Sequence, residues 1–79
     1  MASRDFRWNA YNLGKVAKHG VTPAEAEHVV RFARRPYPRR HKEGTWIVFG
    51  RGNSNRKLQV IFTIDPEDTY YVIHAMHVR

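Results

Sequence analysis

The 79-residue sequence contains no cysteine, which excludes disulfides and thiolate metal sites and removes any sign of an oxidising compartment. Its apolar runs are far shorter than the roughly 20 residues that cross a bilayer. Residues 1–8 carry charges where a secretory signal needs an apolar stretch. We therefore predict a cytoplasmic protein without a membrane partner. The length predicts a single domain, residues 1–79.

Acidic residues are scarce. The chain has 7 Asp and Glu against 14 Lys and Arg, a net charge of +7. Most of these cations are arginine, which binds phosphate through two parallel hydrogen bonds and stacks on bases. The charge predicts a polyanionic partner: RNA or DNA first, an acidic protein second and a membrane surface third. The plainer alternative is a small domain that is basic without such a partner.

Two hydrophobic runs, residues 46–51 and 57–64, are rich in β-branched and aromatic residues and are joined by turn formers at 52–56. This pattern predicts a β-hairpin. After a turn at 65–68, residues 69–78 predict a last strand. Strict alternation would put Tyr70, Val72, His74 and Met76 on one face and Tyr71, Ile73, Ala75 and His77 on the other.

Two helices are predicted before the hairpin. Residues 10–18 form the first, with Asn9 as N-cap and Gly20 ending it in the left-handed region. Its expected apolar stripe is Ala10, Leu13, Val16 and Ala17.

The second helix has the clearest local signal. Thr22 is the expected N-cap, Pro23 the first helical residue, and Glu25 closes a capping box. The helix is expected to run to about Phe32 or Ala33. Its expected buried face is Ala26, Val29, Val30 and Ala33, with Glu25 facing out or at the edge.

With residues 6–8 as a short first strand, the order is a strand, two helices and then a three-stranded antiparallel meander. Because helices and strands are segregated, the fold class is α+β, a small sheet packed on the helices.

Residues 31–42 form a basic stretch that contains Tyr37 and two prolines, and the prolines rule out a continuing helix. Cations combined with an aromatic ring suit the backbone and bases of single-stranded RNA. The alternatives are a solvated loop and a docking segment for an acidic protein. The candidate RNA-binding residues are Arg34, Arg35, Tyr37, Arg39, Arg40, Arg56, His77 and Arg79.

Several motifs occur in one order along the chain: Phe6-Arg7-Trp8-Asn9, Asn12, Lys18-His19-Gly20-Val21-Thr22-Pro23, Ala26, Phe49-Gly50-Arg51, Leu58-Gln59-Val60-Ile61-Phe62 and Val72-Ile73-His74-Ala75. In this combination the chain resembles the BrnT-type toxins, small ribonucleases within the RelE-like group of bacterial toxin–antitoxin systems. The resemblance covers nearly the whole chain.

The resemblance implies a RelE-like α+β fold and the toxin of a type II system. Such a toxin is a metal-independent endoribonuclease that cleaves mRNA without a cofactor and is neutralised by an antitoxin encoded nearby. Two features depart from the family: Met76 stands near a position where members usually carry arginine, and the usual C-terminal helices are lacking after Arg79. The alternative is a catalytically inactive BrnT-like basic domain that binds RNA or a protein partner. A homodimer is left open.

Metal-free RNA cleavage needs a base for the 2′-hydroxyl, a cation for the phosphate and an acid for the leaving oxygen. Our catalytic candidates are Lys18, His19, Arg51 and His74. Each has a plainer alternative: Lys18 and His19 as helix-end groups, Arg51 as a surface charge and His74 as a core or edge histidine. His74 and His77 are three apart on a strand and point to opposite faces, so we predict no metal site.

Overall fold

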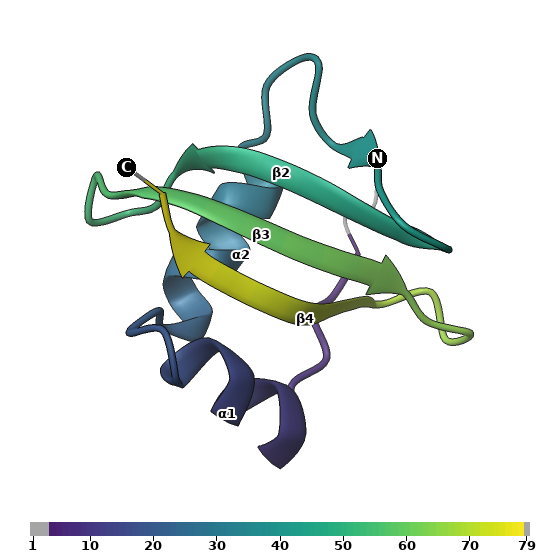
Figure 1. Cartoon of the computed structure of the whole chain (residues 1–79). Helices are drawn as coiled ribbons and strands as arrows, with labels where there is room; N and C mark the ends of the chain where they lie inside the picture. The colour runs from purple at the N-terminus through teal and green to yellow at the C-terminus, as the bar shows by residue number, and fades with distance from the viewer. Residues whose placement is uncertain (1–3, 79) are drawn as a thin grey trace.

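The computed structural model describes residues 4–78 and has two helices and four strands (Figure 1). The elements are α1 (Ala10–Ala17), α2 (Pro23–Arg31), β1 (Arg39–Arg40), β2 (Thr45–Arg51), β3 (Lys57–Ile64) and β4 (Tyr70–His77). The strands form one antiparallel sheet in the order β1-β2-β3-β4. The α+β class and the hairpin are confirmed. The sheet has one strand more than the predicted meander, because Arg39 and Arg40 pair with Ile47 and Trp46.

The predicted first strand at residues 6–8 is reduced to a single bridge. Phe6 pairs with Tyr70 in a parallel bridge outside the named strands. The Arg7 N–H donates to the Tyr70 carbonyl at 2.9 Å. This contact ties the start of the chain to β4.

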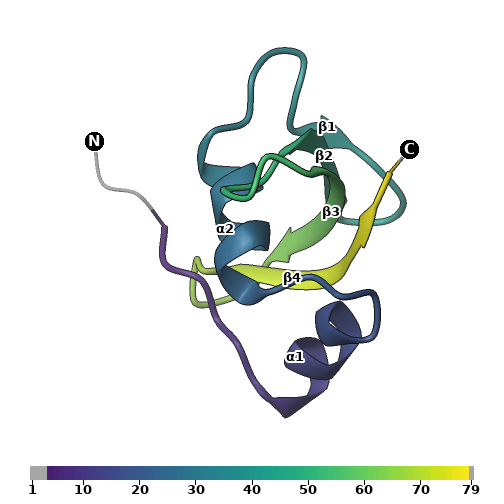
Figure 2. The same ribbon diagram turned by 90° about the vertical axis from the view of Figure 1, so that its left-hand side faces the viewer.

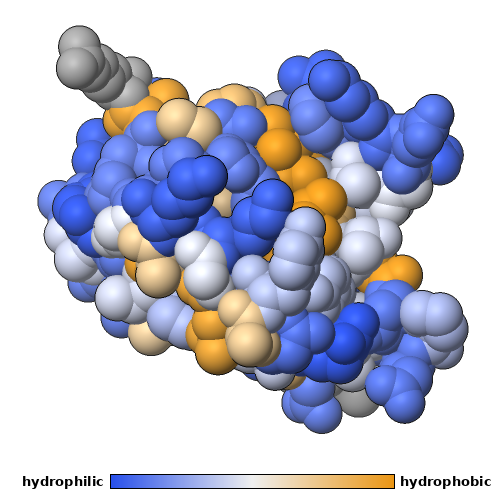
Figure 3. All heavy atoms as spheres, turned by 60° about the horizontal axis from the view of Figure 1, so that its bottom comes forward, coloured by the Kyte–Doolittle hydropathy of each residue, from blue (hydrophilic) through white to orange (hydrophobic). Residues whose placement is uncertain are grey.

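The sheet curves around α2, while α1 lies alongside β4 (Figure 2). The side chains between α2 and the sheet are apolar and almost fully excluded from solvent, which supplies the main stabilising free energy of a chain this short. They include Val29, Val48, Leu58, Val60, Phe62, Val72 and Ala75. Seen from the side of α1, the surface is mostly hydrophilic, with hydrophobic atoms in narrow strips (Figure 3).

Both helices begin with a capping box. The predicted pair of Thr22 and Glu25 is confirmed. On α1, the predicted N-cap Asn9 is confirmed, and Asn12 caps the Asn9 backbone in return, which the sequence did not indicate. Asn12 is fully buried and also donates to the Arg7 carbonyl at 3.0 Å. The predicted apolar stripe of α1 is therefore wrong except for Val16. Ala10, Leu13 and Ala17 are exposed, because Asn12 takes the inward position one turn before Val16.

A β-bulge interrupts the alternation of β4. Ile61 pairs with His74 and Phe62 with Val72, so Ile73 is an extra residue. As a result Val72 and Ala75 are both buried, although they are three residues apart. The predicted faces of β4 are wrong beyond Ile73: Ala75 follows Val72 on the core side, and His74 does not.

Glu25 was expected to face outward or to lie at the edge of its helix, but its carboxylate is buried among the described core residues. Its side chain is only 5% exposed and forms an ion pair with Arg56 (Nη2 to Oε1, 2.6 Å; Nε to Oε2, 3.1 Å). The Ser54 hydroxyl and the Thr22 N–H also donate to it. The hydrogen bonds from Arg56 are the main reason why the pKa of Glu25 falls from 4.5 to about 2. Burial is tolerated because every carboxylate oxygen has a partner.

Within residues 4–78, neither helix is long and apolar enough to cross a membrane.

We predict that Arg56→Ala lowers the free energy of unfolding by about 2–3 kcal/mol, because it leaves a buried carboxylate unpaired. Arg4→Ala is the matched control, since Arg4 pairs with Asp68 at the surface. It should cost less than about 1 kcal/mol. Urea denaturation at pH 7 measures both.

The lowered pKa of Glu25 also predicts how the stability of the protein changes at low pH. Because the pKa of Glu25 is lower in the folded protein, its stabilising contribution is complete above pH 4.5 and is lost as the pH falls toward 2. The difference between wild type and Arg56→Ala should therefore shrink over that range. A difference that stays constant down to pH 2 would contradict this assignment.

Candidate catalytic and RNA-binding site

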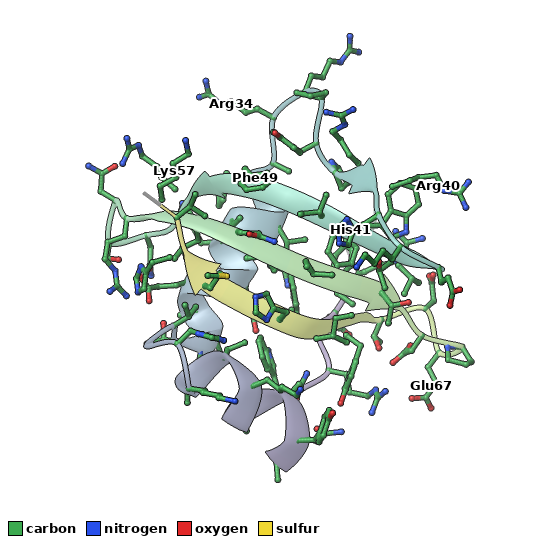
Figure 4. All side chains as sticks on the ribbon, in the orientation of Figure 1. Arg34, Arg40, His41, Phe49, Lys57 and Glu67 are labelled. Atoms are coloured by element: carbon green, nitrogen blue, oxygen red, sulfur yellow. The ribbon has the colours of Figure 1, made fainter. Side chains whose placement is uncertain are left out.

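Cationic side chains gather at one end of the sheet. The loop between α1 and α2 and the turn between β2 and β3 meet there, because Arg56 Nη2 donates to the Gly20 carbonyl at 3.2 Å. We call this the cationic end and define it by Lys18, His19, Arg51, Lys57 and His77. Its nearby acid, Glu25, is already neutralised by Arg56. The turn containing Asp65, Glu67 and Asp68 lies at the opposite end, as the positions of Lys57 and Glu67 in Figure 4 show.

Two of the four catalytic candidates are in direct contact. The rings of His19 and His74 lie edge to face, with centroids 5.1 Å apart and an interplanar angle of 69°. His19 follows α1 and is exposed, while His74 comes from β4 and is half-buried. The sequence separation of the two residues gave no local signal for this contact, which depends on how α1 packs on β4.

The environment of His74 disfavours its protonated form. Burial is the largest cause of its lowered pKa, and the neighbouring charges of His19 and Lys15 add to it. Sequence reasoning missed Lys15 as a member of the site. The i, i+4 spacing of Lys15 and His19 could have indicated that both lie on one side of α1.

A further contact fixes β4 against the start of α1. The Tyr71 hydroxyl donates to Asn9 Oδ1 at 3.2 Å. Tyr71 and His74 lie on the same side of β4, since both pair with residues of β3 that face away from the core. This hydrogen bond and the packing of the two rings hold α1 in place over His74.

Of the other two catalytic candidates, Lys18 lies beside the imidazole pair and Arg51 lies apart from it. Lys18 is the C-cap of α1, exposed and adjacent to His19 in the chain. Arg51 is at the end of β2, two strands away from β4 and four residues further along the sheet than the row of His74. With sheet spacings of about 3.3 Å and 4.8 Å, this separates the two Cα atoms by roughly 16 Å. Arg51 therefore does not share one phosphate with His19 and His74.

The predicted RNA-binding residues that the structure describes fall into three groups. Arg56 is held by Glu25 and Gly20, so its guanidinium serves the fold. A Cβ placed on Gly20 would lie 3.9 Å from His77 Nε2, which puts His77 at the cationic end. The remaining described residues, Arg34, Arg35, Tyr37, Arg39 and Arg40, lie on the segment between α2 and β2, and Arg79 lies outside the described residues.

Some of this segment is already engaged by aromatic contacts. Arg40 lies over the Trp46 ring, 5.7 Å from its centroid. The Tyr37 ring packs on Phe49 at 5.6 Å. In Figure 4, Arg34 projects above Phe49 near the edge of β2, while Arg40 lies toward the other end of the strand. Over the described part of the chain, no group of three or more His, Asp or Glu side chains is arranged to hold a metal ion.

Comparison with known proteins adds no relative: no family model matches the sequence, and neither a curated protein nor a solved structure is significantly similar to it.

We predict that the His74 ring titrates below 6.5 in a proton NMR titration, because burial and nearby positive charge oppose its protonation. Lys15→Ala should raise the midpoint toward 6.5, while Lys18→Ala, the control, should leave it unchanged. A midpoint above 6.5 in the wild type would contradict the geometry described for this pair.

Proposed function

We propose that this protein cleaves single-stranded RNA without a metal ion, with His74 as general base and His19 as general acid. The observation that carries the proposal is the pair of imidazoles in contact at 5.1 Å, from two different elements, with Lys15 close enough to lower the pKa of His74. Two imidazoles and a lysine provide a base, an acid and a cation for the phosphate, the groups that this reaction requires.

The reaction is an intramolecular transfer. Neutral His74 accepts the proton of a ribose 2′-hydroxyl, whose oxygen attacks the adjacent phosphorus. The P–O5′ bond breaks, and protonated His19 gives its proton to the leaving oxygen. The products are a 2′,3′-cyclic phosphate and a 5′-hydroxyl end, so atoms and charges balance without a further reactant. The lowered pKa of His74 suits a base that must be neutral near pH 7.

The roles of the remaining candidates follow from their distance to this pair. Lys15 and Lys18 stabilise charge on the phosphate that is being cleaved. Arg51, roughly 16 Å away by sheet geometry, binds another phosphate of the same strand. In this proposal Arg51 contributes to affinity for RNA and does not touch the reacting phosphorus.

The sequence resemblance to BrnT-type toxins extends the proposal. It makes mRNA the substrate, a nearby-encoded antitoxin the partner and growth arrest the outcome of expression. The net charge of +7 supports an acidic or nucleic-acid partner. Both the family and the toxin role are part of the proposal.

We predict that the purified protein cleaves an RNA oligonucleotide in EDTA and leaves 2′,3′-cyclic phosphate ends. His19→Ala and His74→Ala should each slow cleavage by about 100-fold or more, which is the usual contribution of a positioned acid or base. The control is His41→Ala, which removes an exposed histidine outside the cationic end. A 2′-O-methyl strand should stay intact, because it has no 2′-hydroxyl proton.

Cleavage that is unchanged in His74→Ala, or that requires Mg²⁺, would rule out this mechanism. RNA that is bound but never cut would favour the alternative of an inactive RNA-binding domain. Expression in growing bacteria tests the toxin role separately: wild type should arrest growth and His74→Ala should not.

A further inference from the structure

A pocket lies between α2 and the outer edge of β2, away from the imidazole pair. It has a volume of about 450 Å³ and is lined by His28, Phe32, Arg34, Phe49, Gly50 and Arg51. The pocket is open to ligands along β2 because β1 pairs only with Trp46 and Ile47, so β1 does not cover the edge from Val48 onward. Its volume falls within the usual range for small-ligand sites, about 300–1,000 Å³.

Two arginines from different elements line this pocket. Arg34 comes from the loop after α2 and Arg51 from the end of β2. Neither forms an ion pair with an acid of the described chain, whose three ion pairs are Arg4–Asp68, Arg7–Asp65 and Arg56–Glu25. Arg51 uses Nη1 for the Asn55 carbonyl at 3.0 Å, which leaves donors for a ligand. Two arginines without acidic partners favour an anion with several oxygen acceptors, such as a phosphate.

The pocket also presents aromatic surface. Phe32 is 67% exposed, the highest value among the exposed large hydrophobic side chains. Its ring packs on the ring of His28, with centroids 4.6 Å apart and an interplanar angle of 34°. Phe49 lines the same pocket, and its ring packs on that of Tyr37. A planar ligand that covers Phe32 would remove apolar surface from water, which is favourable.

We propose that this pocket binds one nucleotide of single-stranded RNA, with the base stacked on Phe32 and the phosphate between Arg34 and Arg51. An aromatic plane beside paired guanidinium groups is the combination by which proteins hold single strands. An acidic peptide would satisfy the arginines but would leave Phe32 without a stacking partner, so the aromatic surface favours a nucleotide.

The pocket and the imidazole pair are joined across the exposed face of the sheet. Phe49, Gln59 and Met76 are register partners on β2, β3 and β4 and form one row on this face. His74 lies on the same face in the next row, opposite Ile61. A strand a few nucleotides long can therefore occupy the pocket and present a more distant phosphate to His19 and His74. In this respect the inference rests on the proposed function.

The test is binding of a fluorescent 2′-O-methyl oligonucleotide, which cannot be cleaved, measured by anisotropy as a function of salt. Phe32→Ala should weaken binding about 10-fold, because base–aromatic stacking is lost. Leu13→Ala is the control, as Leu13 is a large apolar side chain, 40% exposed on α1 and outside the pocket, and it should leave affinity unchanged. Both side chains are exposed, so both variants should fold, and circular dichroism verifies this.

The arginines are tested through the salt dependence. Arg34→Gln and Arg51→Gln should each reduce the slope of log Kd against log salt by about 0.7, as expected for the loss of one phosphate contact to a single strand. Arg4→Gln is the control and should not change the slope, because Arg4 is already paired with Asp68 at the opposite end of the sheet. A poly-glutamate peptide that displaces the oligonucleotide, together with wild-type affinity in Phe32→Ala, would assign the pocket to an acidic protein and overturn the proposal.

Failure of this proposal can be told apart from failure of the proposed function. Binding that depends on Phe32 without any RNA cleavage keeps the nucleotide pocket and removes the nuclease. Cleavage that depends on His74, with binding unaffected by Phe32→Ala and Arg34→Gln, keeps the nuclease and removes the pocket.

Discussion

The buried carboxylate of Glu25 is the interaction on which the arrangement of this protein depends. It accepts from Thr22 at the start of α2 and from Ser54 and Arg56 in the turn between β2 and β3. Arg56 in turn donates to the Gly20 carbonyl. One carboxylate thus joins the loop between the helices to the far turn of the hairpin. Because His19 immediately precedes Gly20, this connection helps to fix its ring near His74.

The same ion pair determines which cations are free to bind a partner. Arg56 carries a charge in the middle of the cationic end, but its donors are satisfied by Glu25 and Gly20. The charges that remain available belong to Lys18, Arg51 and Lys57, and the acidic turn at residues 65–68 lies at the other end of the sheet. This separation of charge supports the proposal of a polyanionic partner, and salt should weaken such an attraction.

The sequence predicted the elements whose signals are local. The capping box of Thr22 and Glu25, the hairpin strands and the left-handed Gly20 (φ +72°) are confirmed. Interactions between distant residues could not be predicted in this way. The spacing of Thr22 and Glu25 indicates a helix cap. Nothing local indicates that Arg56, 31 residues further along the chain, forms an ion pair with the Glu25 carboxylate. The inward position of Asn12 was not predicted for a similar reason, since its burial depends on the Arg7 carbonyl as well as on Asn9.

The bulge in β4 explains both a wrong prediction and the existence of the candidate site. In a regular strand, His74 would lie on the same face as Val72 and point into the core. The extra residue Ile73 shifts the register, so that Ala75 fills the next core position opposite Val60 and His74 moves to the other face. On that face it meets the His19 ring. Had the strand been regular, a core imidazole without a neighbour from α1 would have been the expected outcome. The bulge therefore converts a buried position into one where an imidazole is half-buried and paired, an environment that lowers its pKa and supports the proposed role of His74 as a base.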